Sequence, residues 1–137
     1  HKINNHQPLS KCFRNIGHIH IKLKNYSEAI KYYDKALVIN KELQNWSSLT
    51  HNYSNIGVIY NELKKNDTAL IYYDSALMAN EKTGNKFMKM VISYNSAEIL
   101  YEQKKYEDAL NLYRDILSQA ENQGSIYGVF KAYKSLV

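Results

Sequence analysis

The chain has 137 residues, enough for one globular domain with a buried hydrophobic core. Hydrophobic residues make up 45% of it and charged residues 23%, which excludes an intrinsically disordered chain. The formal net charge is +5, but acidic residues stand among the lysines in every segment, so we expect a solubilising surface and no nucleic-acid partner.

Apolar residues recur at intervals of three and four, which is the period of an amphipathic helix and not the alternation of a strand. The first segment shows this period at Phe13, Ile16, His20 and Leu23. Breaks rich in lysine, asparagine and glycine separate the segments. We therefore predict a loop or disordered segment at 1–7 and then helices at about 8–23, 27–43, 47–63, 67–83, 87–103, 107–123 and 126–137.

The breaks also predict how helices begin and end. Gly84 and Gly124 fit the left-handed residue that closes a helix. Asn25, followed three residues later by Glu28, resembles a capping box that would begin the second helix.

The chain repeats itself every 40 residues without gaps. Gly17 and Gly57 are one period apart, and Ala97 stands at the next step. The same interval relates the members of three further sets, which are Ala29, Ala69 and Ala109, then Tyr33, Tyr73 and Tyr113, then Leu37, Leu77 and Leu117. A fixed period of about 20 to 50 residues marks a solenoid or a propeller, and the helical spacing within each repeat selects a helical solenoid.

The order of aromatic, branched, small and aromatic residues within each period resembles the tetratricopeptide repeat. The first repeat carries it at Phe13, Ile16, Gly17, His20, Ala29, Tyr33 and Ala36; the second at Tyr53, Ile56, Gly57, Tyr60, Ala69, Tyr73 and Ala76; the third, less regular, at Ser93, Ser96, Ala97, Leu100, Ala109, Tyr113 and Ile116. The usual proline at the end of each repeat is missing, and Lys41, Glu81 and Glu121 take its place.

The resemblance covers residues 8–137 and implies an all-α fold, a right-handed α-solenoid of three helix-turn-helix repeats in a single domain. The repeats would span about 8–45, 46–85 and 86–124, and a capping or truncated helix would occupy 125–137. The period exceeds the common one of about 34 residues. It is similar to those of kinesin light chain, Rap-type peptide-sensing regulators and bacterial sensor proteins that join such repeats to a histidine kinase or a DNA-binding domain.

The family resemblance implies a module that binds a peptide or protein segment in a concave groove. The alternative is a signal-input or self-association domain of a bacterial sensor kinase or transcription regulator, with Tyr127, Val129, Phe130 and Tyr133 forming a homodimer contact. Because the chain begins at His1 and not at methionine, we expect it to be part of a longer regulatory protein. A cytoplasmic location is favoured, with the periplasm as the alternative.

In this family the groove is lined by the first helix of each repeat. By alignment the positions are Lys11, Arg14, Asn15, His18 and Lys22, then His51, Ser54, Asn55, Val58, Asn61 and Glu62, then Val91, Tyr94, Asn95, Glu98, Tyr101 and Glu102. Asn15, Asn55 and Asn95 recur at the full period, and their amides could hold a peptide backbone. A structural bond to the neighbouring helix, preserved by repeat duplication, is the alternative.

The predicted groove is basic at its first repeat and acidic at its third, so charge could orient a partner segment with its acidic end toward the first repeat. Isolated charges on exposed helix faces would give the same pattern, and this alternative stays open.

Nothing in the sequence indicates catalysis. His18 and His20 point to different helix faces, and no metal-protease, nucleophile-elbow or phosphate-loop motif occurs. Cys12 is the only cysteine, which rules out an internal disulfide, and its apolar neighbours suggest a small buried side chain. We expect no enzymatic activity, no cofactor and no metal. No run approaches the ~18 apolar residues of a membrane span, so we expect no membrane contact from this segment.

Overall fold

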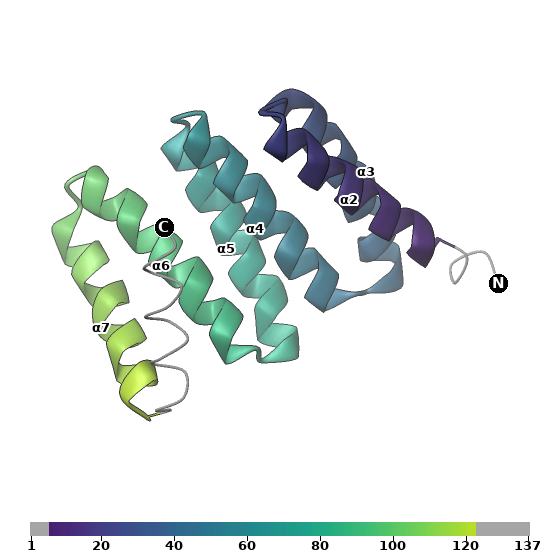
Figure 1. Ribbon diagram of the computed structural model, residues 1–137. Coiled ribbons are helices and arrows are strands. Elements are labelled where there is room, and N and C mark those ends of the chain that lie inside the picture. Colours follow the sequence, from purple (N-terminus) through teal and green to yellow (C-terminus); the bar gives the residue numbers. More distant parts are fainter. Residues whose placement is uncertain (1–5, 123–137) are drawn as a thin grey trace. The chain divides into compact units, whose positions relative to one another are not determined.

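The computed structural model describes residues 6–122. It contains the helices α2 (Gln7–Lys22), α3 (Tyr26–Leu43), α4 (Trp46–Glu62), α5 (Asn66–Thr83), α6 (Lys86–Glu102) and α7 (Tyr106–Asn122), shown in Figure 1. No strand occurs between residues 6 and 122. The all-α prediction is confirmed, and the helix bounds agree with the predicted ones to within one residue. The predicted terminal helix, Gly124 and the proposed dimer contact lie outside the described residues.

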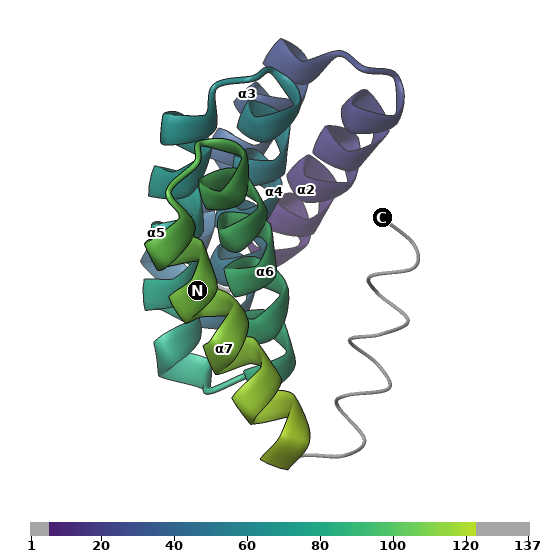
Figure 2. The same cartoon turned by 90° about the vertical axis from the view of Figure 1, so that its left-hand side faces the viewer.

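The chain divides into two compact units, and the boundary along the sequence lies between Thr83 and Gly84. The N-terminal unit contains α2 to α5, with α2 packed on α3, α3 on α4 and α4 on α5. The C-terminal unit contains α6 packed on α7. Within the N-terminal unit, α2 and α4 lie on one side and α3 and α5 on the other (Figure 2).

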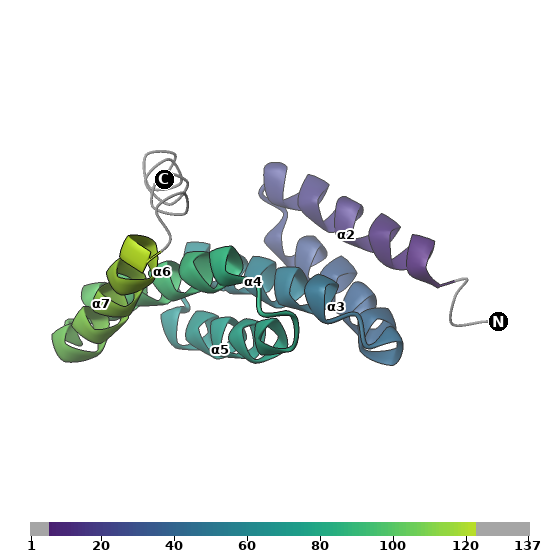
Figure 3. The ribbon, with the colours of Figure 1, turned by 90° about the horizontal axis from the view of Figure 1, so that it is seen from below.

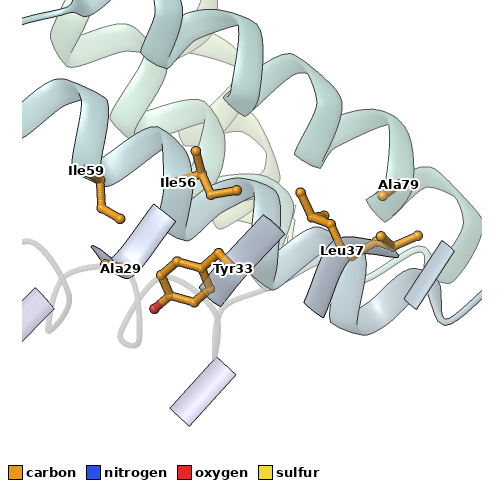
Figure 4. Packing of buried hydrophobic residues seen from close by; sticks show 7 residues of the cluster. Ala29, Tyr33, Leu37, Ile56, Ile59 and Ala79 are labelled. Atoms are coloured by element: carbon orange, nitrogen blue, oxygen red, sulfur yellow. The ribbon is translucent and has the colours of Figure 1, made fainter. Parts of the chain in front are cut away.

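The core of the N-terminal unit forms where α3 and α4 meet, as Figure 4 shows. Its buried members are Ala29, Tyr33, Leu37, Leu49, Ile56, Ile59 and Ala79. The periodic alanines of α3 and α5 are 0% exposed, and these are Ala29, Ala36, Ala69 and Ala76. Small side chains at these positions let neighbouring helices approach closely, so the 40-residue repeat is a repeat of packing positions.

Gly17 and Gly57 lie inside helices, where glycine costs roughly 1 kcal/mol relative to alanine. A Cβ atom on Gly17 would lie 3.1 Å from Cζ of Tyr33, and one on Gly57 would lie 2.7 Å from Cε1 of Tyr73. The two tyrosines are 0% and 1% exposed. In each of these repeats the glycine of the first helix therefore makes room for the tyrosine ring of the second.

A residue in the left-handed conformation lies in each turn between consecutive helices from α2 to α7. Lys24, Lys64 and Lys104, one period apart, have φ values of 60°, 62° and 65°. At the other turns, Gln44 has φ 51° and Gly84 has φ 66°. The prediction for Gly84 is confirmed, and the same backbone conformation is held elsewhere by longer side chains.

Asparagine side chains begin α4 and α6. The Ser48 N–H donates to Oδ1 of Asn45 over 3.2 Å, and the Met88 N–H donates to Oδ1 of Asn85 over 3.0 Å. These bonds satisfy backbone donors that a helix leaves free in its first turn.

The predicted capping box at the start of α3 is wrong. Asn25 makes no side-chain cap bond. Its backbone N–H, which a capping-box glutamate would accept, donates instead to the carbonyl of His20 over 2.8 Å. Glu28 turns outward to Lys31, with 3.1 Å between Oε1 and Nζ.

The expectation that Cys12 is buried is also wrong, because this side chain is exposed. The residues one and two periods later, Asn52 and Ile92, are both 0% exposed. Asn52 lies on α4, which has α3 packed against it, whereas residues 6–122 contain no helix before α2 that could cover Cys12.

Candidate functional site

The predicted groove residues of the N-terminal unit lie on α2 and α4, the two helices on the same side of that unit (Figure 3). The exposed ones are Lys11, Asn15, His18, Lys22, His51 and Glu62. The half-buried ones are Arg14, Asn55, Val58 and Asn61. Ser54 is only 7% exposed and presents little surface to a partner.

Asn15 and Asn55 occupy equivalent positions on α2 and α4, and Asn55 is the more buried of the two. Neither side chain hydrogen-bonds to another residue in the part of the chain that the structure describes. Their amide groups are thus available to hydrogen-bond with a partner on this face of the N-terminal unit. Asn95 is half-buried on α6 in the C-terminal unit, where it has an interaction of its own.

Four basic side chains gather on the face of α2 and α4. We call Arg14, His18, Lys22 and His51 the basic cluster. Partial burial of the His18 ring lowers its pKa, and the charges of Arg14, Lys22 and His51 lower it further. Partial burial of the His51 ring lowers its pKa, and the charge of Arg14 lowers it further. The side chains of the two helices therefore lie close enough to repel one another when protonated.

The hydroxyl of Tyr33 supports the cluster from beneath. Its oxygen lies 3.0 Å from Nδ1 of His18, and the two rings meet edge to face with centroids 5.7 Å apart. Burial raises the pKa of Tyr33, so the hydroxyl stays neutral and fixes the imidazole without compensating its charge. Between residues 6 and 122, the ion pairs are Lys31 with Glu28 and, if the histidine is protonated, His6 with Glu42. The basic cluster consequently lacks an internal acidic partner among these residues.

The predicted acidic part of the groove lies on α6 in the C-terminal unit and is partly used within that unit. The hydroxyl of Tyr113 on α7 donates a hydrogen bond to Oε1 of Glu98. Burial raises the pKa of Tyr113, and the bond to Glu98 raises it further. Tyr94 meets Tyr113 edge to face with centroids 6.1 Å apart, which places this tyrosine in the packing of α6 on α7.

Tyr101 is 60% exposed and meets Tyr106 edge to face, with centroids 5.8 Å apart. A shallow pocket of about 250 Å³ lies beside it, between α6 and α7. Tyr101 is thus the member of the predicted α6 set with the most evident apolar surface for a partner.

A larger pocket lies in the N-terminal unit and involves residues that the family alignment does not assign to the groove. It has a volume of about 370 Å³ and is lined from α3, α4 and α5, with Trp46, Tyr53 and Met78 among its walls. The signal that could have revealed it is a break in the repeat: the only tryptophan of the chain stands where the neighbouring repeats have His6 and Lys86.

Between residues 6 and 122, no group of three or more His, Cys, Asp and Glu side chains is arranged to hold a metal ion. In the same part of the chain, no helix has the length and apolar character needed to cross a membrane.

Comparison with protein families gives three matches to the tetratricopeptide repeat, at residues 10–43, 50–83 and 93–122. Each match falls within one helix pair, which is α2–α3, α4–α5 or α6–α7. A comparison with curated proteins finds no match. The chain therefore belongs to the tetratricopeptide repeat family, whose repeats are generally protein–protein interaction modules and typically non-catalytic scaffolds.

Proposed function

We propose that this protein binds an acidic segment of a partner protein on the face of α2 and α4, as part of a larger regulatory protein. The observation that carries the proposal is the basic cluster: Arg14, His18 and Lys22 from one helix and His51 from the next, with no acidic partner within residues 6–122. Like charges brought together in this way destabilise the free protein, and a carboxylate placed between them removes that repulsion.

The asparagines beside the cluster supply a second element of recognition. The open amides of Asn15 and Asn55 can donate to a carbonyl and accept from an N–H of an extended segment. Such bonds bind a backbone without regard to its side chains, whereas Arg14 can bind a carboxylate with two parallel hydrogen bonds. Amides and cations on one face would therefore favour an acidic segment over a neutral one.

A pair of labelled peptides tests the proposal. One alternates glutamate with glycine, and the other has glutamine in place of every glutamate. Fluorescence anisotropy should show tighter binding of the glutamate peptide, with an affinity that falls as salt is added. Equal affinity for the two peptides would overturn the proposal.

Substitutions locate the binding to the cluster. At a pH low enough to protonate the histidines, the double variant Arg14→Gln, His51→Gln should weaken the binding of the glutamate peptide by about two- to thirtyfold, because two exposed ion pairs of roughly 0.2–1 kcal/mol each are lost. The matched control is Lys89→Gln, an exposed lysine on α6, which should leave the affinity unchanged. Asn15→Ala with Asn55→Ala should weaken binding with no loss of helical circular dichroism. Unchanged affinity in that variant would reject the role of the amides.

A further inference from the structure

We infer that the pocket between α3, α4 and α5 is a second binding site, which takes a large apolar side chain of a partner protein that has acidic residues next to it. The pocket has a volume of about 370 Å³, at the lower end of the ~300–1,000 Å³ typical of binding pockets. The residues that matter are Lys41 of α3, Trp46 and Tyr53 of α4, and Ser75, Met78 and Lys82 of α5. None of them belongs to the basic cluster.

The walls of the pocket are of the kind that proteins use to hold apolar groups. Met78 is 70% exposed and Trp46 is 36% exposed, although both are large and apolar enough to favour burial. Tryptophan and methionine are enriched at the centres of protein interfaces. A flexible methionine can also adjust its shape around an incoming side chain.

Two lysines mark the edge of the pocket and determine the charge of the occupant. Nζ of Lys82 lies 5.7 Å from the centroid of the Trp46 ring, and Nζ of Lys41 lies 6.0 Å from that of Tyr53. Neither lysine forms an ion pair with another residue in the range 6–122. The charge of Lys41 interacts with that of Asp34, an acid on the same helix. Two ammonium groups around an apolar cavity favour an apolar side chain with carboxylates beside it.

The pocket arises where the chain departs from its own period. At the equivalent place in the first repeat stands Lys35, whose Nζ lies 5.6 Å from the Phe13 ring centroid and 5.1 Å from that of Tyr32. One period later stands Ser75, whose short hydroxyl donates back to the carbonyl of Ile71 over 3.2 Å. Repeat duplication explains residues that recur, but it does not explain the serine, methionine and tryptophan that open and line this cavity.

The single tryptophan gives a direct readout, because any change in intrinsic tryptophan fluorescence comes from Trp46. The probe is the acetylated and amidated peptide Gly-Asp-Phe-Asp-Gly, with two comparators: one has alanine for the phenylalanine, the other asparagine for both aspartates. The probe should change the Trp46 emission and shift the Met78 methyl signal in a saturable way. Each comparator should bind about tenfold more weakly. No change at Trp46 and Met78, or equal effects of the three peptides, would overturn the inference.

Ser75→Lys restores the residue of the first repeat and should close the pocket. Lysine is a good helix former, so the variant should fold. It should reduce the affinity measured at Trp46 by about tenfold or more. Ser118→Lys, the same change at an exposed position of α7, is the control and should have no effect. Unaltered binding by the Ser75→Lys protein would contradict the inference.

Two further arms separate this site from the other proposals. One arm asks whether the peptide binds without perturbing Trp46 and Met78, and whether this binding is lost in the Arg14→Gln, His51→Gln variant. That result would refute binding in the pocket and would assign the peptide to the basic cluster. Laurate serves as the probe for a lipid. Saturable changes at Trp46 with laurate, but not with the peptide, would mean that the occupant is a fatty acid, and the inference would be wrong.

Discussion

At the scale of single residues, the depth at which a tyrosine packs depends on the residue that faces it. Tyr33 and Tyr73 pack over Gly17 and Gly57 and are almost completely buried. The third repeat has Ala97 in place of the glycine, and Tyr113 is only half-buried there, with its hydroxyl bonded to Glu98. A Cβ atom at this position takes space that the ring would otherwise fill.

The substitution Gly57→Ala should therefore destabilise the protein more than Gly17→Ala. Overpacking costs about 1–3 kcal/mol, whereas alanine recovers about 1 kcal/mol of helix propensity. The added Cβ would lie 2.7 Å from the ring of Tyr73 but 3.1 Å from that of Tyr33, so the cost exceeds the gain only at Gly57. Urea unfolding followed by circular dichroism should show a loss of about 1–2 kcal/mol for Gly57→Ala and a small change for Gly17→Ala. Equal losses would contradict this explanation.

Asn52 on α4 is a polar residue in the core of the protein. This side chain is 0% exposed, and neither of its amide atoms has a hydrogen-bond partner in the described part of the chain. Ile92, one period later, fills the same position with an apolar side chain and is also 0% exposed. Asn52→Leu keeps the number and branching of the side-chain heavy atoms and removes two unpaired polar atoms, so the free energy of unfolding should rise by about 1–3 kcal/mol. Asn55→Leu, on the same helix but half-buried, is the control and should give no such gain; a less stable Asn52→Leu protein would show that the amide is satisfied.

At the scale of helices, the sequence alone was sufficient to predict the boundaries. The three repeats follow one another without gaps, so the turns between helices recur at the same positions of each repeat. Each of these turns in residues 6–122 contains a residue in the left-handed conformation, such as Lys64 or Gly84. The nature of the caps was harder to predict, because an asparagine before a helix can bond to several nearby groups. Asn25 and Asn45 both precede a helix, but only Asn45 accepts a backbone N–H.

This difference predicts unequal effects of alanine at the two positions. Asn45→Ala should lower the free energy of unfolding by about 1 kcal/mol, because the N–H of Ser48 loses its acceptor. Asn25→Ala removes no cap bond and should cost markedly less. Thermal unfolding of the two variants beside the wild type measures the difference, and a larger effect at Asn25 would refute the assignment of the caps.

At the scale of the whole molecule, the fold could be predicted from the sequence, but only part of the geometry of the candidate site could. The repeat places Arg14, His18 and His51 on helix faces, and the structure brings them within range of one another's charge. The burial of Ser54 and the bond between Tyr113 and Glu98 depend on neighbouring helices, which a position within the repeat does not specify. The pocket beside Trp46 escaped prediction because it depends on residues that break the period.

The basic cluster also makes stability depend on pH. The pKa values of His18 and His51 are lowered in the folded protein, so the unfolded chain binds more protons as the pH falls below about 6.5. Stability is fully present above that pH and declines as the pH falls through the lowered pKa values of the folded protein. Burial raises the pKa of Asp34, so this residue makes the free energy of unfolding fall as the pH rises, which is opposite to the effect of the histidines. The contribution of Asp34 is the same in every variant that retains it.

His51→Gln should consequently reduce the loss of stability between about pH 7.5 and pH 5.5. The measurement is the free energy of unfolding in urea at several pH values, for this variant and the wild type. The affinity of the wild type for the glutamate peptide should be higher at the lower pH, because protonated histidines add positive charge to the cluster. Parallel stability curves for the two proteins would exclude His51 as a source of the pH dependence.

The left-handed lysines have a consequence for protease sensitivity. Lys24, Lys64 and Lys104 are exposed at the turns within successive helix pairs, and the last two are followed by a second lysine. Trypsin cleaves after lysine, and exposed turns are where a folded chain is most readily cut. Limited digestion should therefore cut first at these turns, giving fragments that end one repeat apart, so that the period of the sequence becomes visible as a ladder of masses.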